Sequence, residues 1–297
     1  MKRIFLFLFT GLLFCFASVS FKIQERTSGY NFAKPNTSIT LPPVLHEISG
    51  ITVIDSNSVA CVEDEDGILF IYDLSKNTIS RQYTFGPKGD YEGICKAENS
   101  MYVLRSDGVL TEILNYNSKH FKVNTYVTGI PANNNEGLCY DEENNRLLIG
   151  CKGKVIPGPE HKDKRLIYAF DLKTKKLIPE PIFEFNVQII KQFAIDSKIN
   201  LPVRLKKKGQ TAESILKFAT SAICLHPATK ELYLLSAADH LLFIFNQAGT
   251  IEHVQQLNPD IYNKAEGLVF FSNSDMLITN EGQDKKPTLL RLNYKNK

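Results

Sequence analysis

A short phrase built around a small residue recurs five times along the chain, and it restricts the possible folds more than any other feature. The copies are Ile48-Ser49-Gly50-Ile51, Tyr91-Glu92-Gly93-Ile94, Asn135-Glu136-Gly137-Leu138, Thr220-Ser221-Ala222-Ile223 and Ala265-Glu266-Gly267-Leu268. The small third residue recurs after 43, 44, 85 and 45 positions. A period of this length is typical of supersecondary units that bury their faces against one another. Most of the chain is therefore predicted to form one array of repeats.

Each phrase is followed by the pattern of several short strands. In the first unit, the apolar strand Ser58–Val62 leads through a turn ending in Asp66-Gly67 to the alternating strand Ile68–Leu74. In the second unit, Met101–Leu104 leads to a turn ending in Asp107-Gly108. Asp-Gly between alternating apolar residues is a strong hairpin signal. Four strands every 43 to 45 residues predict an all-β chain folded as a β-propeller of four-stranded blades.

The number of blades depends on the long interval. It equals one repeat plus about forty residues, and within residues 187–219 the stretches Ile189-Ile190 and Ala212–Phe218 suggest short helices and loops. We therefore predict five blades with an insertion at about 187–219; six blades, with the 186–220 region as a diverged blade, is the alternative. The last unit has room for only three strands, so Ser38–Leu41 should supply the fourth and close the ring by pairing the N- and C-terminal strands.

The N-terminus has the pattern of a secretory signal. Lys2-Arg3 precede an apolar run from Ile4 to Ala17, and the small residues Ser18 and Ser20 follow. An uncleaved membrane anchor is the alternative. We expect residues 1–20 to be a signal peptide or N-terminal membrane anchor, 21–37 a linker and 38–297 a single propeller domain. Localisation is then exported: periplasmic, membrane-associated through the N-terminal segment, or extracellular.

Charge and cysteine spacing exclude some functions. The chain has 35 basic and 32 acidic residues, and this balance argues against nucleic acid as a partner. Cys95, Cys139 and Cys224 occupy one position of the repeat, which is typical of a small buried residue, so we expect free thiols. The cysteine and histidine spacings match no zinc pattern.

Propeller geometry brings two sets of polar residues to one end of the axis. The inner strand of each blade starts at this end, and the hairpin between the second and third strands returns to it. Both insertions, 155–164 and 187–219, should lie over the same face as a lid or rim. The candidate metal ligands are Glu92, Glu136 and Glu266. The candidate ligand-binding residues are Ser49, Asp64, Glu65, Arg105, Ser221, Asn280 and Glu281.

Three glutamates around one axis need a compensating cation, because neighbouring carboxylates repel each other. Oxygen ligands on flexible loops suit calcium better than zinc or copper. Alternatively, the glutamates hold the blades in register by accepting hydrogen bonds from strand N–H groups or by pairing with Arg105 and Lys152. The residues leave both roles open.

The ordered phrases over about residues 40–297 resemble the SdiA-regulated (YjiK-like) β-propeller family of bacterial envelope proteins. The resemblance is carried by Leu45-His46-Glu47-Ile48-Ser49-Gly50-Ile51, Gly89-Asp90-Tyr91-Glu92-Gly93-Ile94, Asn135-Glu136-Gly137-Leu138, Ala265-Glu266-Gly267-Leu268 and Asn280-Glu281-Gly282. It implies export or membrane association and, through members connected with calcium response, Ca²⁺ binding. It supplies no catalytic residues. The 187–219 insertion and Ser221-Ala222, where other members have Glu-Gly, make the ring asymmetric.

Two functions follow from these observations. The first is a non-enzymatic envelope propeller that binds a cation, Ca²⁺, or a small ligand at the axial face, in calcium response or as an interaction scaffold for an envelope protein. The second is a metal-dependent hydrolase similar to the lactonase and esterase propellers, in which an axial metal activates water or polarises a carbonyl. No residue of this chain is assigned a catalytic role, and the sequence does not predict an oligomeric state.

Overall fold

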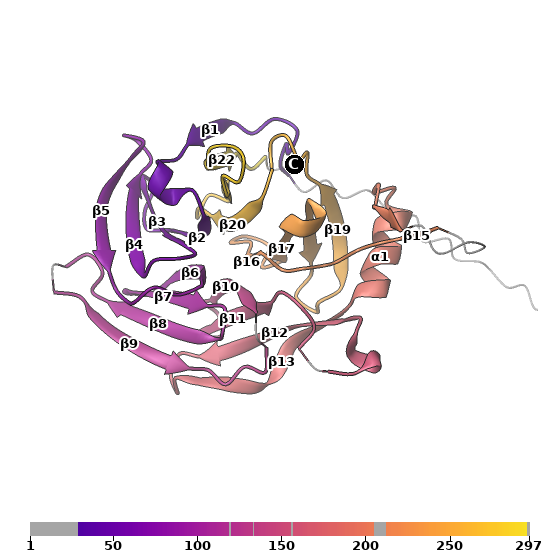
Figure 1. Ribbon diagram of the computed structural model, residues 1–297, viewed down its shortest axis with the longest axis horizontal. Coiled ribbons are helices and arrows are strands. Elements are labelled where there is room, and N and C mark those ends of the chain that lie inside the picture. Colours follow the sequence, from indigo (N-terminus) through magenta and orange to yellow (C-terminus); the bar gives the residue numbers. More distant parts are fainter. Residues whose placement is uncertain (1–28, 119, 133, 156, 205–211, 296–297) are drawn as a thin grey trace, which may run out of the picture.

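Five four-stranded antiparallel sheets form a ring in the computed structural model, which describes residues 29–295 apart from 119, 133, 156 and 205–211. Figure 1 shows the inner strands of the five sheets gathered around the centre of the ring. The fold is a five-bladed β-propeller, so the predicted fold class is confirmed. The described residues of the 186–220 region form no sixth four-stranded sheet.

In the first four blades the chain runs from the inner strand to the outer strand. The first blade contains β2 to β5, at Ile48–Val53, Ser58–Glu63, Ile68–Asp73 and Thr78–Thr84. The second contains β6 to β9, at Tyr91–Ala97, Ser100–Arg105, Val109–Leu114 and Lys122–Val127. The third contains β10 to β13, at Asn135–Asp141, Arg146–Cys151, Lys164–Asp171 and Lys176–Asn186. The fourth contains β16 to β19, at Ala222–Leu225, Leu232–Ser236, Leu241–Phe245 and Ile251–Gln256. The fifth, also from inner to outer strand, contains β20, β21, β22 and β1, at Ala265–Phe270, Met276–Asn280, Thr288–Leu292 and Thr37–Thr40.

The ring is closed by the first and last strands, as predicted. β1 pairs antiparallel with β22, with Thr37 opposite Arg291 and Thr40 opposite Thr288. The chain just before β1 also packs on the ring: Phe32 is buried among side chains of the fourth and fifth blades, and the Tyr30 hydroxyl donates to the Ser274 carbonyl over 2.6 Å. The described part of the predicted linker is therefore docked between two blades. The predicted signal or anchor at residues 1–20 lies outside the described residues.

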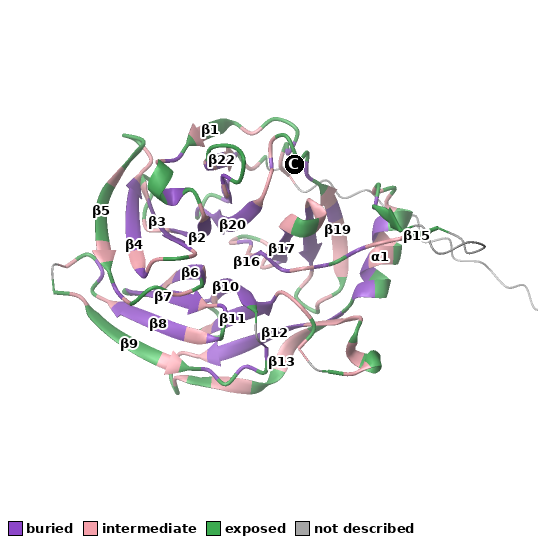
Figure 2. Ribbon diagram, in the orientation of Figure 1, coloured by how far each residue is buried: buried purple, intermediate pink, exposed green. Residues whose placement is uncertain are grey.

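Burial follows the position of a strand within its blade. Strands β3 and β4 are buried along most of their length, because both faces of a blade pack against neighbouring blades, whereas the outer strand β5 is mostly exposed. Figure 2 shows the same change from buried inner strands to exposed outer strands in several blades. The sequence signal is a short run of apolar residues in the middle strands and a polar outer strand.

The insertion lies at the rim of the ring. Helix α1 (Val187–Asp196) begins at Asn186, whose side chain caps it, and contacts the outer strands β13 and β19 at the edge of the ring (Figure 1). A two-stranded hairpin, β14 (Val203–Arg204) with β15 (Glu213–Ser214), follows. The described remainder of the secondary structure consists of short 3₁₀ turns η1 (Pro43–Leu45), η2 (Pro159–His161) and η3 (Ala237–Asp239). No helix among the described residues is long and apolar enough to span a membrane.

Of the stretches predicted to form short helices and loops, the first lies in helix α1, whereas Ala212–Phe218 holds β15 and a loop. Leu216 and Phe218 are both buried in the core around α1, and burial of residues two apart suits an extended chain. The Asp239 carboxylate accepts hydrogen bonds from the Lys217 and Phe218 N–H groups at 2.9 and 2.8 Å, which satisfies the backbone without helical bonds. Lys206, Lys207 and Lys208 lie outside the described residues.

The repeated glycine allows neighbouring inner strands to approach closely. A Cβ on Gly93 would lie 2.8 Å from the Cβ of Leu138 and 2.9 Å from the Glu136 carbonyl oxygen, both in the next blade. Neither atom belongs to the end of a flexible side chain, so an added methyl group would force the blades apart.

We expect Gly93→Ala to destabilise the propeller by about 3 kcal/mol, because the clash involves the start of a neighbouring strand. Urea denaturation of purified protein measures this difference. Gly153→Ala is the matched control, because no atom lies within 4 Å of its added Cβ. Equal stability of the two variants would contradict the steric explanation.

A second repeated position connects the inner strands through hydrogen bonds. The Thr52 hydroxyl accepts from the Lys96 N–H at 3.1 Å, and the Cys139 sulfur accepts from the Leu225 N–H at 3.2 Å. Each bond joins one blade to another, so this position supplies an acceptor to an inner strand edge as well as packing. The described cysteines are free thiols, and all but Cys224 are buried.

Candidate functional site

A β-bulge sits at the start of the inner strand in four blades. In the second blade Tyr91 pairs with Arg105 and Gly93 with Leu104, so Glu92 has no partner of its own in the register. The residues in the same position of the other three blades are Ser49, Glu136 and Glu266. A bulge changes the direction of a side chain relative to a regular strand. The repeated phrase therefore encodes both the bulge residue and the close-packed glycine after it.

The bulge residues meet at one end of the axis. Ser49, Glu92, Glu136 and Glu266, together with Ser221 of the fourth blade, line a single cavity of about 10 Å³. This volume is close to that of the smallest cavity able to hold one water molecule. The structure thus brings together all three predicted metal ligands and two of the predicted ligand-binding serines. Ser221 also donates to the Ala265 carbonyl and accepts from the Ala237 N–H, which fixes its hydroxyl.

Two lysines lie among the axial carboxylates. The Lys152 ammonium, from the connection after β11, forms an ion pair with Glu136. The Lys264 ammonium lies 3.5 Å from Glu266 and also contacts Glu281. Apart from its ion pair, the Glu136 carboxylate, which is almost fully buried, has no hydrogen-bond partner among the described residues. Lys152 was anticipated as a partner, whereas Lys264 was not, although it directly precedes the phrase that contains Glu266.

The electrostatics of the ring disfavour ionised carboxylates. Burial, then repulsion from Glu136 and Asp90, raises the pKa of Glu92 to about 9. Burial and the Glu266 carboxylate raise the pKa of Glu136 to about 7, although Lys152 opposes this shift. Burial likewise raises the pKa of Glu266, against the effect of both lysines. At neutral pH the ring therefore holds protons that a bound cation could replace.

A second acidic group lies beside the ring. One ligand oxygen from each of Glu47, Glu63 and Asp64 lies within 4.8 Å of the others. No other three acidic, histidine or cysteine residues of the described chain approach one another so closely, the axial glutamates included. Glu63 also closes its own hairpin by accepting from the Glu65 and Asp66 N–H groups. Burial, then Glu47 and Glu281, raises the pKa of Asp64 to about 7.

The remaining predicted ligand-binding residues are placed differently. Glu281 lies between the two acidic groups: Lys264 contacts both Glu281 and Glu266, and the Glu281 carboxylate contributes to the raised pKa of Asp64. Glu65 is exposed, and Arg105 is held by two hydrogen bonds to Asp107 rather than by an axial glutamate. Asn280 is fully buried and donates to the Ile261 carbonyl and the Thr288 hydroxyl, a structural arrangement.

The opposite end of the channel is wider. A cavity of about 480 Å³ is lined by the later residues of the inner strands, including Cys95, Cys139 and Cys224. One aliphatic residue from each of four blades lines both this cavity and the acidic one: Ile51, Ile94, Leu138 and Leu268. These side chains separate the narrow acidic end of the channel from the wider end, which is lined by thiols. The repeat pattern alone does not predict that the two ends differ in width.

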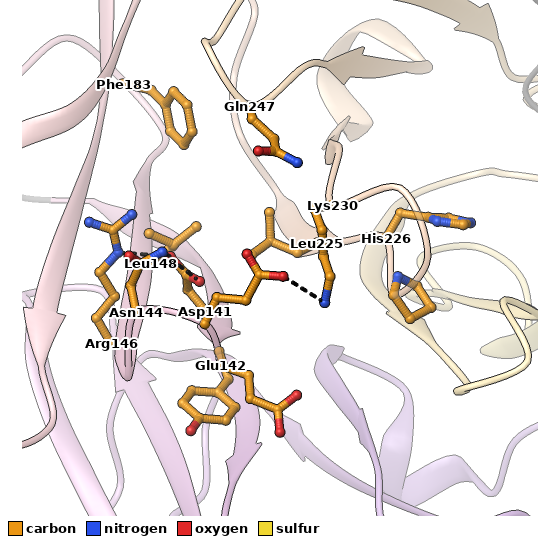
Figure 3. A pocket seen from close by; sticks show the side chains of 13 residues that line it. Asp141, Glu142, Asn144, Arg146, Leu148, Phe183, Leu225, His226, Lys230 and Gln247 are labelled. Carbon is orange, nitrogen blue, oxygen red and sulfur yellow. Dashed lines mark hydrogen bonds and ion pairs between the residues drawn. The ribbon is translucent and has the colours of Figure 1, made fainter.

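A third hollow of about 350 Å³ lies between the third and fourth blades (Figure 3). Leu148, Phe183 and Leu225 form apolar parts of its wall, and the Lys230 ammonium crosses from the fourth blade to Glu143 of the third at 3.3 Å. Asp141 is held by Asn144 and Arg146 of its own blade. The hollow shares Leu225 with the wide cavity, so this junction is loosely filled at the end opposite the acidic ring.

Comparisons with known proteins place the chain at the level of fold. No protein-family model and no curated protein sequence matches it. Among solved structures, glutaminyl cyclase of Myxococcus xanthus aligns over 89% of this chain and 97% of its own, with 14% identity and a TM-score of 0.55. The likeness lies in the propeller fold. A streptogramin B lyase structure aligns over 86% of this chain and 97% of its own, with 13% identity and a TM-score of 0.47.

Proposed function

We propose that this chain is an exported, non-enzymatic β-propeller that binds a hard divalent cation, Ca²⁺, at the acidic end of its axis. One observation carries the proposal: bulges at equivalent positions direct Glu92, Glu136 and Glu266 to a single cavity, and their carboxylates outnumber the lysines that contact them. The ligands would be these carboxylates, aided by Ser49.

The size and chemistry of the cavity support an ion. A volume of about 10 Å³ suits a single ion or water, whereas pockets for organic ligands commonly measure about 300–1,000 Å³. This comparison favours the cation over the ester or lactone substrate of a hydrolase. Carboxylate and hydroxyl oxygens are the ligands that Ca²⁺ prefers.

Lys152 and Lys264 act in the proposal as resident competitors of the cation. Their ammonium groups neutralise Glu136 and Glu266 in the metal-free protein, and the axial carboxylates do not gather as tightly as a filled site would require. Binding of Ca²⁺ would then require the carboxylates to close around the ion and release at least one lysine. Affinity should therefore depend on the lysines as well as on the carboxylates.

Calorimetric titration of metal-stripped protein with Ca²⁺ tests the proposal. We expect Glu136→Gln to weaken binding about tenfold or more, because it removes a buried carboxylate ligand. Lys152→Met should strengthen binding several-fold, because it removes a competing cation that contacts Glu136. No heat of binding in the parent protein would refute the proposal.

Two further variants locate the ion. Glu98→Gln changes an exposed carboxylate at the opposite end and should bind like the parent. Asp64→Asn tests the neighbouring acidic group of Glu47, Glu63 and Asp64. Loss of binding in Asp64→Asn but not in Glu136→Gln would move the ion to that group and contradict the axial assignment.

The resemblance of the repeated phrases to the SdiA-regulated (YjiK-like) family supports a place in the bacterial envelope, with a role in calcium response or as a scaffold for an envelope protein. Membrane association would come from residues 1–20. Fractionation of cells that produce the full chain tests this, since recovery in the cytoplasm would contradict it.

A further inference from the structure

We propose that Cys139 and Cys224 form a reversible disulfide that links the third and fourth blades at the wide end of the central channel. The two cysteines occupy the same position of the repeat, on inner strands β10 and β16 of adjacent blades. The proposal is independent of cation binding, because both thiols lie at the wide end of the channel rather than in the acidic ring.

The two thiols are in contact. A hydrogen bond with the Cys224 side chain is the main cause that raises the pKa of the Cys139 thiol, and burial is the second. The backbone brings them together as well, because the Leu225 N–H, one residue after Cys224, donates to the Cys139 sulfur at 3.2 Å. The two thiols thus lie on directly neighbouring strands, as a disulfide between them requires.

Cys95 is the natural comparison. It holds the same position in the second blade and lines the same cavity of about 480 Å³. Burial, with a smaller electrostatic effect of Cys139, raises the pKa of its thiol, but no direct contact with Cys139 contributes. Of the three cysteines at this position of the repeat, only Cys139 and Cys224 therefore contact each other directly.

Solvent can reach this pair. Both sulfur-bearing residues line the wide cavity, and Cys224 is only partly buried. Tyr140 and Leu225, their neighbours in sequence, also line the hollow between the third and fourth blades that Figure 3 shows. A small disulfide reagent can therefore approach Cys224 through the wide cavity.

The link would reinforce the junction between the third and fourth blades. The 187–219 insertion separates the third and fourth blades in sequence, and the hollow of about 350 Å³ lies between them. A bond from Cys139 to Cys224 would close a loop of 85 residues across this junction. Closing a long loop restricts the unfolded chain and so favours the folded ring.

The chemistry is thiol–disulfide exchange with a low-molecular-weight disulfide such as oxidised glutathione. The Cys224 thiolate attacks one glutathione sulfur, forms a mixed disulfide and releases one glutathione thiolate, which takes up the proton that Cys224 lost. The Cys139 thiol, after losing its proton, attacks the Cys224 sulfur and releases the second glutathione. The protein loses two electrons and two protons, and oxidised glutathione becomes two reduced molecules.

Oxidation of the native full chain with oxidised glutathione tests the inference. We expect two of the six cysteine thiols to disappear, non-reducing peptide mapping to recover a peptide joining Cys139 to Cys224, and the Tm to rise by about 10 °C. Reduction with dithiothreitol should reverse all three changes. Glutathione adducts without a cross-link, or a cross-link to Cys95, would overturn the inference.

Variants separate the cross-link from general oxidation. Cys95→Ser should still gain the linked peptide and the Tm shift, whereas Cys224→Ser should gain neither. The peptide map of the parent protein does not depend on the folding of any variant. A rise in Tm on oxidation of Cys224→Ser would assign the stabilisation elsewhere and contradict the proposal.

Discussion

Calcium affinity at the axial cavity should rise at least about tenfold between pH 6 and pH 8.5. The ligands bind a cation only when they are deprotonated, so protons compete with the metal. The pKa of Glu136 is raised to about 7, so this carboxyl is mostly protonated at pH 6 and mostly ionised at pH 8.5. Its ionised fraction alone changes by about a factor of ten over this range.

Glu92 should steepen the dependence further. Its pKa is raised to about 9 by burial and by the Glu136 and Asp90 carboxylates, so it continues to lose its proton up to the top of the range. Calorimetric titrations at several pH values, in buffers with different ionisation enthalpies, would give both the affinity and the number of protons released. Glu136 and Glu92 together should release about two protons per ion at pH 6 and about one at pH 8.

The matched control for pH is Glu136→Gln. This variant cannot lose a proton at position 136, and its Glu92 loses the repulsion from Glu136 while that from Asp90 remains, so its weaker binding should vary less with pH. An affinity that is constant from pH 6 to pH 8.5 in the parent protein would contradict binding through these glutamates.

The ring was predictable because one phrase recurs five times and encodes the same local structure in four of the five blades. A glycine at one position and a glutamate or serine before it encode a bulge and a close approach of strands, and both recur in register around the axis. Repetition compensates for the weak signal of a single short strand. The insertion had no repeat to support it, so its sequence indicated short helices and loops but not the burial of Leu216 and Phe218.

The candidate site was predictable in position but not in pairing. Topology alone brings the starts of the inner strands together, and it correctly puts Glu92, Glu136 and Glu266 around one cavity. Which lysine or arginine side chain pairs with which carboxylate depends on side-chain length and direction, which the repeat pattern does not specify. Arg105 donates a hydrogen bond to Asp107, two residues away, instead of pairing with an axial glutamate. Lys264 forms the ion pair with Glu266, which the sequence spacing did not predict.

Neutralising the buried carboxylate of Glu112 should destabilise the fold strongly, although this residue lies away from the axial site. It accepts hydrogen bonds from Tyr102, from Tyr126 at 2.7 Å and from Lys175 at 2.8 Å. Lys175 belongs to the third blade and the other three residues to the second, so the network joins two blades. We expect Glu112→Gln to lower the free energy of unfolding by about 3 kcal/mol, because Lys175 and the tyrosines lose their charged acceptor.

The pH dependence of this loss distinguishes the network from simple packing. Burial alone would raise the pKa of Glu112, but Lys175 and Tyr102 hold it down at about 2. In the unfolded chain the pKa returns to its usual value near 4.5. The stabilisation is therefore complete above about pH 4.5 and is lost as the pH falls towards 2. Urea denaturation at pH 7, 4 and 3 should show the parent and Glu112→Gln converging in acid. Glu180→Gln, an exposed control, should match the parent at every pH. A constant difference between parent and Glu112→Gln down to pH 3 would mean that shape rather than charge holds these two blades together.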